Sequence, residues 1–220
     1  AVVKVQDGCD MFCSFCSVPL TRGPIRSRSL PDILHDVREA VAHGHKEVVL
    51  TGVLVGAYGR DLGHGAPELA DVVTAVAGVD GIERVRLSSI EPTQVSRRLL
   101  LAIAETPKAC PHLHIPLQSG DDQVLKAMRR PYTASVYLDL CRLAYQMIPY
   151  LAITTDVLVG FPGEDEEAHR RTMEVAREAR FARMHVFRYS ARPRTAAAEI
   201  SAQVSDEDKA RRAQEMTALA

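Results

Sequence analysis

The stretch GCDMFCSFCSVP, residues 8–19, places three cysteines at Cys9, Cys13 and Cys16. Thiolates are the usual ligands of iron–sulfur clusters, and a four-iron cubane held by three of them leaves one iron free for a ligand from outside the protein. The alternative is a structural zinc site completed by a distant histidine. Structural zinc motifs usually pair two Cys-x2-Cys units, and the sequence has no second pair. The spacing therefore favours a cluster with one open position.

The composition is that of one globular domain of ordinary size and charge. The chain has 220 residues, 46% of them hydrophobic and 25% charged, and its formal net charge is −1. This balance gives no overall signature of nucleic-acid binding. No apolar run approaches the roughly 20 residues of a membrane helix, and the first residues lack the apolar core of a signal peptide. Clustered cysteines without an export signal indicate metal or redox chemistry, so we expect a cytoplasmic protein with no membrane partner.

Short β-branched runs alternate with segments of helical periodicity along the chain. The runs predict strands at 2–5, 46–51, 84–90, 112–117, 151–159 and 183–189. Apolar residues three and four apart predict helices at 31–43, 67–77, 94–105, 133–147 and 165–179. Six units in this strict order predict an α/β fold with a parallel sheet and helical crossovers. An open doubly wound sheet and a partial barrel of six units both fit.

The chain end predicts one further helix, which opens with SDED at 205–208. We therefore expect one α/β domain over residues 1–200 and a C-terminal helix over 201–220. The chain has no initiator methionine, starts directly with a strand and stops abruptly at Ala220. We expect it to be part of a longer protein, in which the last helix leads to another domain.

The cysteine motif lies in the long loop after the first strand, residues 7–30. Loops at the carboxyl ends of parallel strands carry the chemistry in both candidate architectures, so the motif lies on that functional face. Cys110 precedes the fourth strand, at the opposite end of the sheet, and Cys141 lies within a helix. We expect both to be packing residues and not a fourth ligand.

Arginines gather on both sides of the same face. Arg22, Arg26 and Arg28 follow the cysteines with no acid among residues 11–31. A second group follows the sixth strand with no acid among residues 182–198, namely Arg188, Arg192 and Arg194. A basic rim of this kind suits a phosphodiester substrate even when the net charge is near zero.

Two histidines, His112 and His114, share one face of the fourth strand, as in some metallohydrolases. No acidic partner or third histidine follows at a supporting spacing. We expect these side chains to fill the barrel.

The cysteine motif, with Phe15 directly before Cys16, resembles that of radical S-adenosylmethionine (SAM) enzymes. Six segments, in order along the chain, are similar to the radical SAM methylthiotransferases: VQDGCDMFCSFCSVPLTRGPIRSRS (5–29), VLTGVLVGAYGRDL (49–62), RLSSIEP (86–92), CPHLHIPLQSGDDQVLKAMRRPYT (110–133), TTDVLVGFPGEDEE (154–167) and HVFRYSARPRTAAAE (185–199). The resemblance implies a partial (β/α)6 TIM-like barrel of the radical SAM type, which decides between the two architectures.

The resemblance also implies the cofactors and partners. A 4Fe–4S cluster on Cys9, Cys13 and Cys16 would bind the amino and carboxylate groups of SAM at its open iron, and one electron would cleave SAM to a 5′-deoxyadenosyl radical. The electron would come from a donor such as flavodoxin or ferredoxin. A second 4Fe–4S cluster, carrying the sulfur to be inserted, is expected in an N-terminal domain outside this chain. The substrate would be tRNA.

Several residues have both a cofactor-binding and a purely structural interpretation. Gly52 ends the second strand near the methionine end of SAM, or only forms a turn. Glu91 suits the SAM amine or a substrate hydroxyl, or caps the following helix. Arg130 suits the SAM carboxylate, or is a solvated helix charge. Gln118 and Ser119 suit the ribose, while Ser119 also suits the N-cap of the next helix.

The turn VGFPGE at 159–164 would let the backbone at Gly160 approach the adenine. Two positions depart from the family pattern, which usually has asparagine at Leu54 and glycine at Arg194. The candidate contacts to substrate are Arg22, Arg26, Arg188 and Arg192.

RLSSIEP (86–92) and TGVLVGAYGRDL (51–62) are most similar to the branch that methylthiolates N6-threonylcarbamoyladenosine beside the tRNA anticodon, at the 2-position of adenine. An arginine-lined mouth suits that carboxylate-bearing group, whereas an isopentenyl group requires an apolar pocket. The alternatives are the isopentenyladenosine and ribosomal-protein branches, another radical SAM enzyme, and a non-catalytic metal-binding module.

Overall fold

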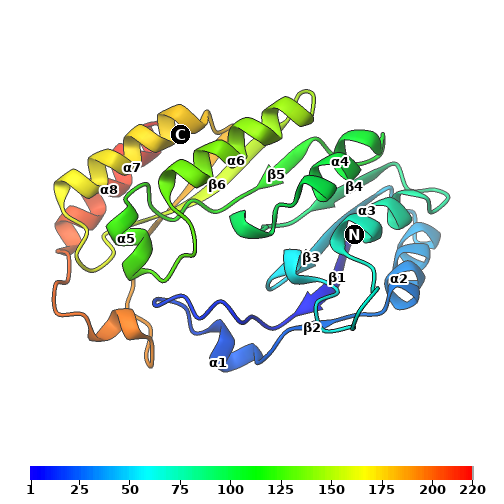
Figure 1. Cartoon of the computed structure of the whole chain (residues 1–220), viewed down its shortest axis with the longest axis horizontal. Helices are drawn as coiled ribbons and strands as arrows, with labels where there is room; N and C mark the ends of the chain where they lie inside the picture. Colours follow the sequence, from blue (N-terminus) through cyan, green and yellow to red (C-terminus); the bar gives the residue numbers. More distant parts are fainter. Residues whose placement is uncertain (220) are drawn as a thin grey trace.

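Six parallel strands follow one another in space in the order in which they occur in the sequence (Figure 1). In this computed structural model, which describes residues 1–219, they are β1 (Val2–Asp7), β3 (Glu47–Gly52), β4 (Arg84–Leu87), β5 (His112–His114), β6 (Ala152–Val159) and β7 (Arg183–Arg188). The pairing β1-β3-β4 and the pairing β5-β6-β7 are each continuous, and parallel bridges from Val85 to Ala109 and from Ser89 to His114 join the two sets. A strand order that never reverses excludes a doubly wound sheet and is that of a partial barrel.

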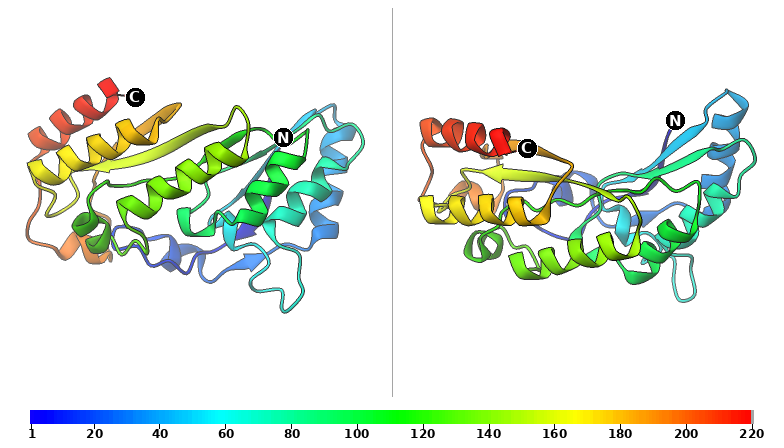
Figure 2. Two further views of the ribbon diagram at one scale, coloured as in Figure 1. Left: turned by 45° about the horizontal axis from the view of Figure 1, so that its top comes forward. Right: turned by 90° about the horizontal axis from the view of Figure 1, so that it is seen from above.

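The helices between the strands cover one face of this curved sheet (Figure 2). They are α2 (Leu30–Ala42), α3 (Leu69–Ala77), α4 (Arg97–Glu105), α6 (Ala134–Met147) and α7 (Glu166–Ala179). On β6 the side chains toward the helices are fully buried, whereas Thr154, Asp156 and Leu158 on the other face are half-buried. The inner face of the barrel is therefore partly open and, at this strand, polar.

The last helix, α8 (Asp206–Leu219), packs against β7 and α7. Arg212, only 4% exposed, joins it to the start of α7 by donating to Glu164 O at 2.9 Å, in the preceding turn, and to Glu166 Oε1 at 2.7 Å, in the first turn of α7. Within residues 1–219, no helix has the length and apolar character needed to cross a lipid bilayer.

Serine and aspartate side chains cap the starts of two of these helices. Ser29 caps α2, and its hydroxyl accepts a hydrogen bond from Asp32 N at 3.2 Å. Asp165 caps α7 by accepting from Ala168 N at 2.8 Å.

Short elements in the loops after the strands were not predicted, because two to six residues are too few to show periodicity. They are α1 (Val18–Arg22), β2 (Arg26–Ser27), α5 (Asp122–Ala127) and the 3-10 helices η1 (Val55–Ala57), η2 (Pro92–Gln94) and η3 (Ala196–Glu199). β2 pairs antiparallel with the end of β1. In Figure 1, α1 lies at the lower edge below the N-terminal loop, and α5 lies above it on the left.

Candidate functional site

The cysteine loop begins with a backbone conformation that only glycine accommodates. Gly8 has φ +78°, and a Cβ there would lie 1.8 Å from Pro24 O. Cys9 N donates to Gly23 O at 3.0 Å, which closes the loop against the segment after α1. Cys16 N donates to Cys13 O at 3.1 Å, which forms the turn between the second and third ligands.

The three thiols are free and half-buried. They are close enough for the charges of Cys13 and Cys16 to raise the pKa of Cys9, after the larger effect of burial. Three thiols gathered in one loop suit an iron–sulfur cluster, whose usual ligands are thiolates.

Ser14, which sequence reasoning did not single out, fixes the loop between two other segments. Its backbone N donates to Met128 O at 3.0 Å, and its Oγ donates to Ala127 O at 2.7 Å, both at the end of α5. Ser14 O accepts from Ala197 N of η3 at 2.8 Å. Phe15 then packs edge-to-face on Phe161, with ring centroids 6.4 Å apart. The motif is thus held by elements that follow β5, β6 and β7.

A buried ion pair lies directly beside the cysteine loop. Arg130 Nη2 and Glu91 Oε1 are 2.9 Å apart, with side chains only 5% and 8% exposed. Arg130 also donates to Cys13 Sγ at 3.3 Å and to Tyr132 Oη at 3.1 Å. Arg130 is therefore not a solvated helix charge. Glu91 does occupy the N-cap position of η2, but its side chain makes no cap hydrogen bond and faces Arg130 instead.

The ion pair keeps unused hydrogen-bonding capacity. Arg130 Nη2 and Glu91 Oε1 face each other at 2.9 Å and have no further hydrogen-bond partner among the described residues. Ser88 Oγ and both side-chain polar atoms of Gln94, in the same segment as Glu91, also lack hydrogen-bond partners there. A donor and acceptor set of this kind fits the ammonium and carboxylate groups of a bound amino acid such as the methionine of SAM.

Burial sets the direction of the pKa shifts in this region. It raises the pKa of Cys13, with the Arg130 guanidinium opposing the rise. Burial likewise raises the pKa of the Glu91 carboxyl, again against the charge of Arg130. Arg130 is therefore the group that favours the anionic forms of both neighbours.

The two predicted glycine contacts have packing roles in this structure. A Cβ on Gly52 would lie 2.8 Å from Oε1 of the fully buried Gln6, which accepts from Leu54 N at 2.7 Å. Gly160 has φ +72°, and a Cβ there would lie 2.3 Å from Lys209 Cγ on α8. Both glycines make room for neighbouring side chains, and their contact with a cofactor stays a prediction.

Gln118 and Ser119 at the end of the β5 segment point to different surroundings. Gln118 is half-buried, has φ +63° and lines a cavity of about 280 Å³ with Phe15 and Asp156. Ser119 is 2% exposed, and its hydroxyl contacts Thr172 of α7 at 3.3 Å. The helix cap expected at Ser119 is instead Asp121, which accepts from Val124 N at 2.8 Å. Gln118 is therefore placed to meet a ligand, and Ser119 is not.

The two arginine groups differ in their charge partners. Acids from outside the sequence window reach the first group: Arg28 pairs with Asp36 at 2.6 Å, and Arg26 lies 3.7 Å from Asp7. The expectation of an uncompensated basic segment is therefore wrong for these two residues. Arg22 makes no ion pair within the described residues.

The second arginine group is free of acidic partners in the described part of the chain. Arg188 and Arg192 are exposed and line the cavity of about 280 Å³. Arg194 adopts φ +67°, a left-handed conformation that explains why the resembled family has glycine there.

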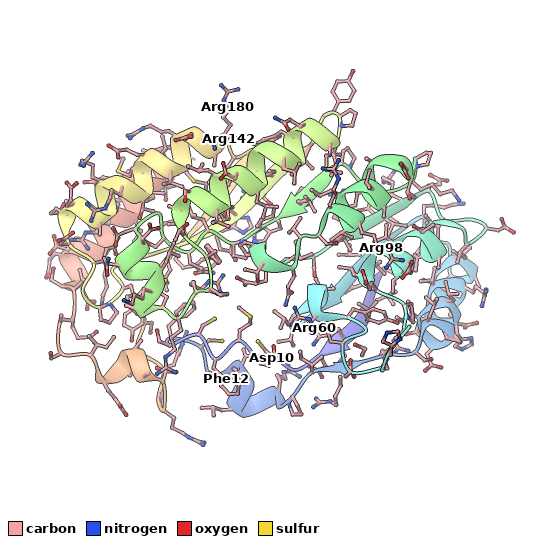
Figure 3. All side chains as sticks on the ribbon, viewed as in Figure 1. Asp10, Phe12, Arg60, Arg98, Arg142 and Arg180 are labelled. Atoms are coloured by element: carbon pink, nitrogen blue, oxygen red, sulfur yellow. The ribbon has the colours of Figure 1, made fainter. Side chains whose placement is uncertain are left out.

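A larger cavity, of about 670 Å³, lies between α6 and α7 on the outer face. It is lined by buried Cys141 and includes none of the three loop cysteines. In Figure 3, Asp10 and Phe12 of the cysteine loop lie along the lower edge of the view, whereas Arg142 and Arg180 lie on the helical side. Because it opens away from the carboxyl ends of the strands, we do not assign the chemistry to it.

The sequence pattern of the radical SAM superfamily matches residues 3–176. The chain is 47% identical over 204 residues to a tRNA-2-methylthio-N(6)-dimethylallyladenosine synthase of Streptomyces coelicolor, covering 93% of this chain and 40% of the relative. It is 40% identical over 221 residues to a threonylcarbamoyladenosine tRNA methylthiotransferase of Bacillus subtilis, covering 100% of this chain and 48% of the relative. The chain thus spans about half the length of the curated relatives it matches.

Solved structures share the fold at low sequence identity. A radical SAM methyltransferase of Kitasatospora setae superposes with a TM-score of 0.75 at 15% identity, covering 90% of this chain and 38% of that chain. Coproporphyrinogen III oxidase of Escherichia coli gives a TM-score of 0.71 at 15% identity, covering 99% of this chain and 51% of that chain.

Proposed function

Because the chain belongs to the radical SAM superfamily, with the methylthiotransferases among its relatives, we propose that it is the radical-generating core of a tRNA methylthiotransferase. The observation that carries the proposal is the cysteine loop held against the buried Glu91–Arg130 pair, with Arg130 donating to Cys13 Sγ. A superfamily member uses a 4Fe–4S cluster and SAM. The three thiols and this charged pair provide one site for each.

The residues that hold the cofactors are proposed from this geometry. Cys9, Cys13 and Cys16 bind the cluster, while Glu91 and Arg130 bind the amino and carboxylate groups of SAM. When bound, the reduced cluster supplies the electron that cleaves SAM to a 5′-deoxyadenosyl radical.

The protein's own contribution is orientation and the exclusion of water. Ser14 fixes the loop through three hydrogen bonds, so the cysteines keep their spacing before any cofactor arrives. Arg130 donates to Cys13 Sγ while facing Glu91, so one guanidinium orients both the cluster ligand and the carboxylate that faces SAM. Phe15 and Phe161 form an apolar wall beside the motif, which keeps water from a radical intermediate.

The substrate we propose is an adenosine next to the tRNA anticodon that carries a group on N6, methylthiolated at C2. Our first choice for that group is threonylcarbamoyl, since Arg188 and Arg192 are exposed, lack acidic partners and line the cavity next to Phe15. The dimethylallyl group is the second candidate. It is favoured by the names of most of the relatives, which reach 47% identity.

The remaining partners follow from the same proposal. Arg22 and Arg26 contribute phosphate contacts from the α1–β2 segment, Arg26 at reduced strength beside Asp7. A second 4Fe–4S cluster, carrying the sulfur to be inserted, belongs to the same proposal. The C-terminal helix expected over 201–220 is α8, which begins only at Asp206. Flavodoxin or ferredoxin supplies the electron, in the cytoplasm.

The test is nucleoside mass spectrometry of tRNA from cells that lack the gene, compared with cells that carry it again on a plasmid. The proposal predicts loss of the 2-methylthio-threonylcarbamoyl nucleoside and its return on complementation. Loss of the methylthio-dimethylallyl nucleoside instead would support the second candidate. Unchanged levels of both methylthio nucleosides would refute the function.

A further inference from the structure

Three potential metal ligands outside the cysteine loop meet on the inner face of the barrel. His114, Asp156 and His185 come from β5, β6 and β7, and one ligand atom of each lies within 4.8 Å of the other two. The Oδ1 atom of Asp156 is 3.2 Å from His114 Nε2 and 3.4 Å from His185 Nδ1. The local sequence around His112 and His114 lacks an acidic partner and a third histidine. In the fold, Asp156 of β6 and His185 of β7 take these places.

The backbone register accounts for this meeting. In the parallel pairing, His114 lies opposite Thr154 and Asp156 lies opposite His185. Side chains two residues apart on a strand share one face, so Thr154 and Asp156 face the two histidines together. The cluster is thus fixed by the sheet itself and not by a mobile loop.

The spacing of the three groups suits a single ion. Nitrogen and oxygen ligands of tetrahedral zinc lie about 2.0–2.2 Å from the metal, which places them about 3.3–3.6 Å from one another. The two contacts at 3.2 and 3.4 Å match that separation. Neither contact is aligned as a hydrogen bond, although both histidine nitrogens face the same carboxylate oxygen.

A supporting hydrogen bond selects the nitrogen that faces Asp156. His114 Nδ1 lies 2.9 Å from Thr154 Oγ1, which leaves Nε2 as the free ligand atom. Metal-binding histidines commonly use their second nitrogen in this way, which fixes the ring orientation. His112 contacts the same Thr154 hydroxyl through Nε2 at 3.1 Å and is not part of the group.

We propose that His114, Asp156 and His185 bind one divalent transition-metal ion of the zinc type, separate from the cysteine site. Two imidazoles and one carboxylate leave a fourth position open in tetrahedral coordination. Asp156 also lines the cavity of about 280 Å³ that contains Phe15, Gln118 and Arg188, so the ion lies at the wall of that cavity. His185 is 46% exposed in its side chain, which gives the ion a path from solvent.

Cobalt(II) binding tests the site, because its visible absorption distinguishes nitrogen and oxygen ligands from thiolates. The titration uses the full chain with all three loop cysteines changed to alanine, so that no thiolate in the loop competes. We expect one Co²⁺ per chain with d–d bands and no sulfur-to-metal charge-transfer band. Asp156→Asn and His185→Ala should each weaken binding at least tenfold, whereas His112→Ala should leave it unchanged.

A second measurement leaves the cysteine loop intact. Zinc content of the cluster-loaded wild-type chain, determined by mass spectrometry after dialysis against micromolar Zn²⁺, should be near one per chain and should fall in Asp156→Asn. Absence of binding, or binding that neither Asp156→Asn nor His185→Ala weakens, would overturn the proposal. The three side chains would then be only a polar layer inside the barrel.

Discussion

Changing Arg130 to methionine removes the guanidinium that faces Glu91 and Cys13 while keeping a side chain of similar length. In the native protein, Arg130 Nη2 lies 2.9 Å from Glu91 Oε1, and the two side chains are only 5% and 8% exposed. Breaking a buried pair leaves an uncompensated charge, which the protein avoids by taking up a proton. We therefore expect the Glu91 carboxyl to become neutral in the variant.

The loss of folding stability in Arg130→Met depends on the pH at which the Glu91 carboxyl must be held neutral. Burial already raises the pKa of Glu91 above its ordinary value of 4.5, and loss of Arg130 raises it further. Holding the group neutral at pH 7 then costs up to about 3.4 kcal/mol, at about 1.36 kcal/mol per pH unit above that ordinary value. At pH 5 the same cost is about 0.7 kcal/mol. The pKa of Glu91 is higher in the folded than in the unfolded chain, so keeping it neutral costs folding free energy only above the unfolded-state value of 4.5. The stability lost by the variant should therefore disappear as the pH falls toward 4.5.

Urea unfolding at several pH values, performed anaerobically on the wild-type chain and on Arg130→Met, measures this difference. The double variant Glu91→Gln, Arg130→Met has no carboxyl to protonate and should recover most of the lost stability at pH 7. Equilibrium dialysis with SAM adds a second readout, in which both variants should bind at least tenfold more weakly. A stability loss independent of pH would refute the energetic reasoning. Full SAM affinity in the double variant would show that the pair is only structural.

Anaerobic reconstitution should give about four irons per chain. Alanine at any of the three loop cysteines should abolish iron uptake, while Cys110→Ala should leave the iron content unchanged. Gly160→Ala should lower the free energy of unfolding by about 2–3 kcal/mol, because backbone strain at φ +72° adds to a clash with Lys209. The control Gly163→Ala, at φ +85° with open space around it, should lower it by about 1 kcal/mol, from the strain alone. Changing Arg188 and Arg192 to alanine should weaken tRNA binding in filter assays and lower the salt slope by about 0.7–0.9 per lost phosphate contact, and lysine at both positions should restore the slope. An unchanged slope in the alanine variant would remove both residues from the RNA interface.

The sequence predicted all six parallel strands because each lies in a short run rich in β-branched or aromatic residues, and their observed order then followed the resemblance. Two strands are shorter than predicted, since β4 ends at Leu87 and β5 at His114. Local signals failed where an element is short or where a side chain's partner is remote. Ser119 was expected to cap the next helix, but that helix is the unpredicted α5, and its cap is Asp121. The same limit hid the histidine–aspartate group, since no local spacing shows that β5, β6 and β7 are adjacent.

The charges near the mouth show the same limit in another form. The sequence between residues 11 and 31 contains no acid that could neutralise Arg26 or Arg28. In the structure, Asp7 of β1 pairs with Arg26 and Asp36 of α2 pairs with Arg28. Arg130 and Glu91 were each predicted as SAM contacts, but their pairing with one another depends on packing that only the structure describes.

The central claim is that Cys9, Cys13 and Cys16 hold a cluster that cleaves SAM reductively. The most direct measurement is 5′-deoxyadenosine, quantified by mass spectrometry after the anaerobically reconstituted chain reacts with dithionite and SAM. We expect the wild-type chain to form 5′-deoxyadenosine and Cys13→Ala to form none, with Cys141→Ala matching the wild type. A wild-type chain that contains four irons yet forms no 5′-deoxyadenosine, or a Cys13→Ala chain that forms as much as the wild type, would contradict this account.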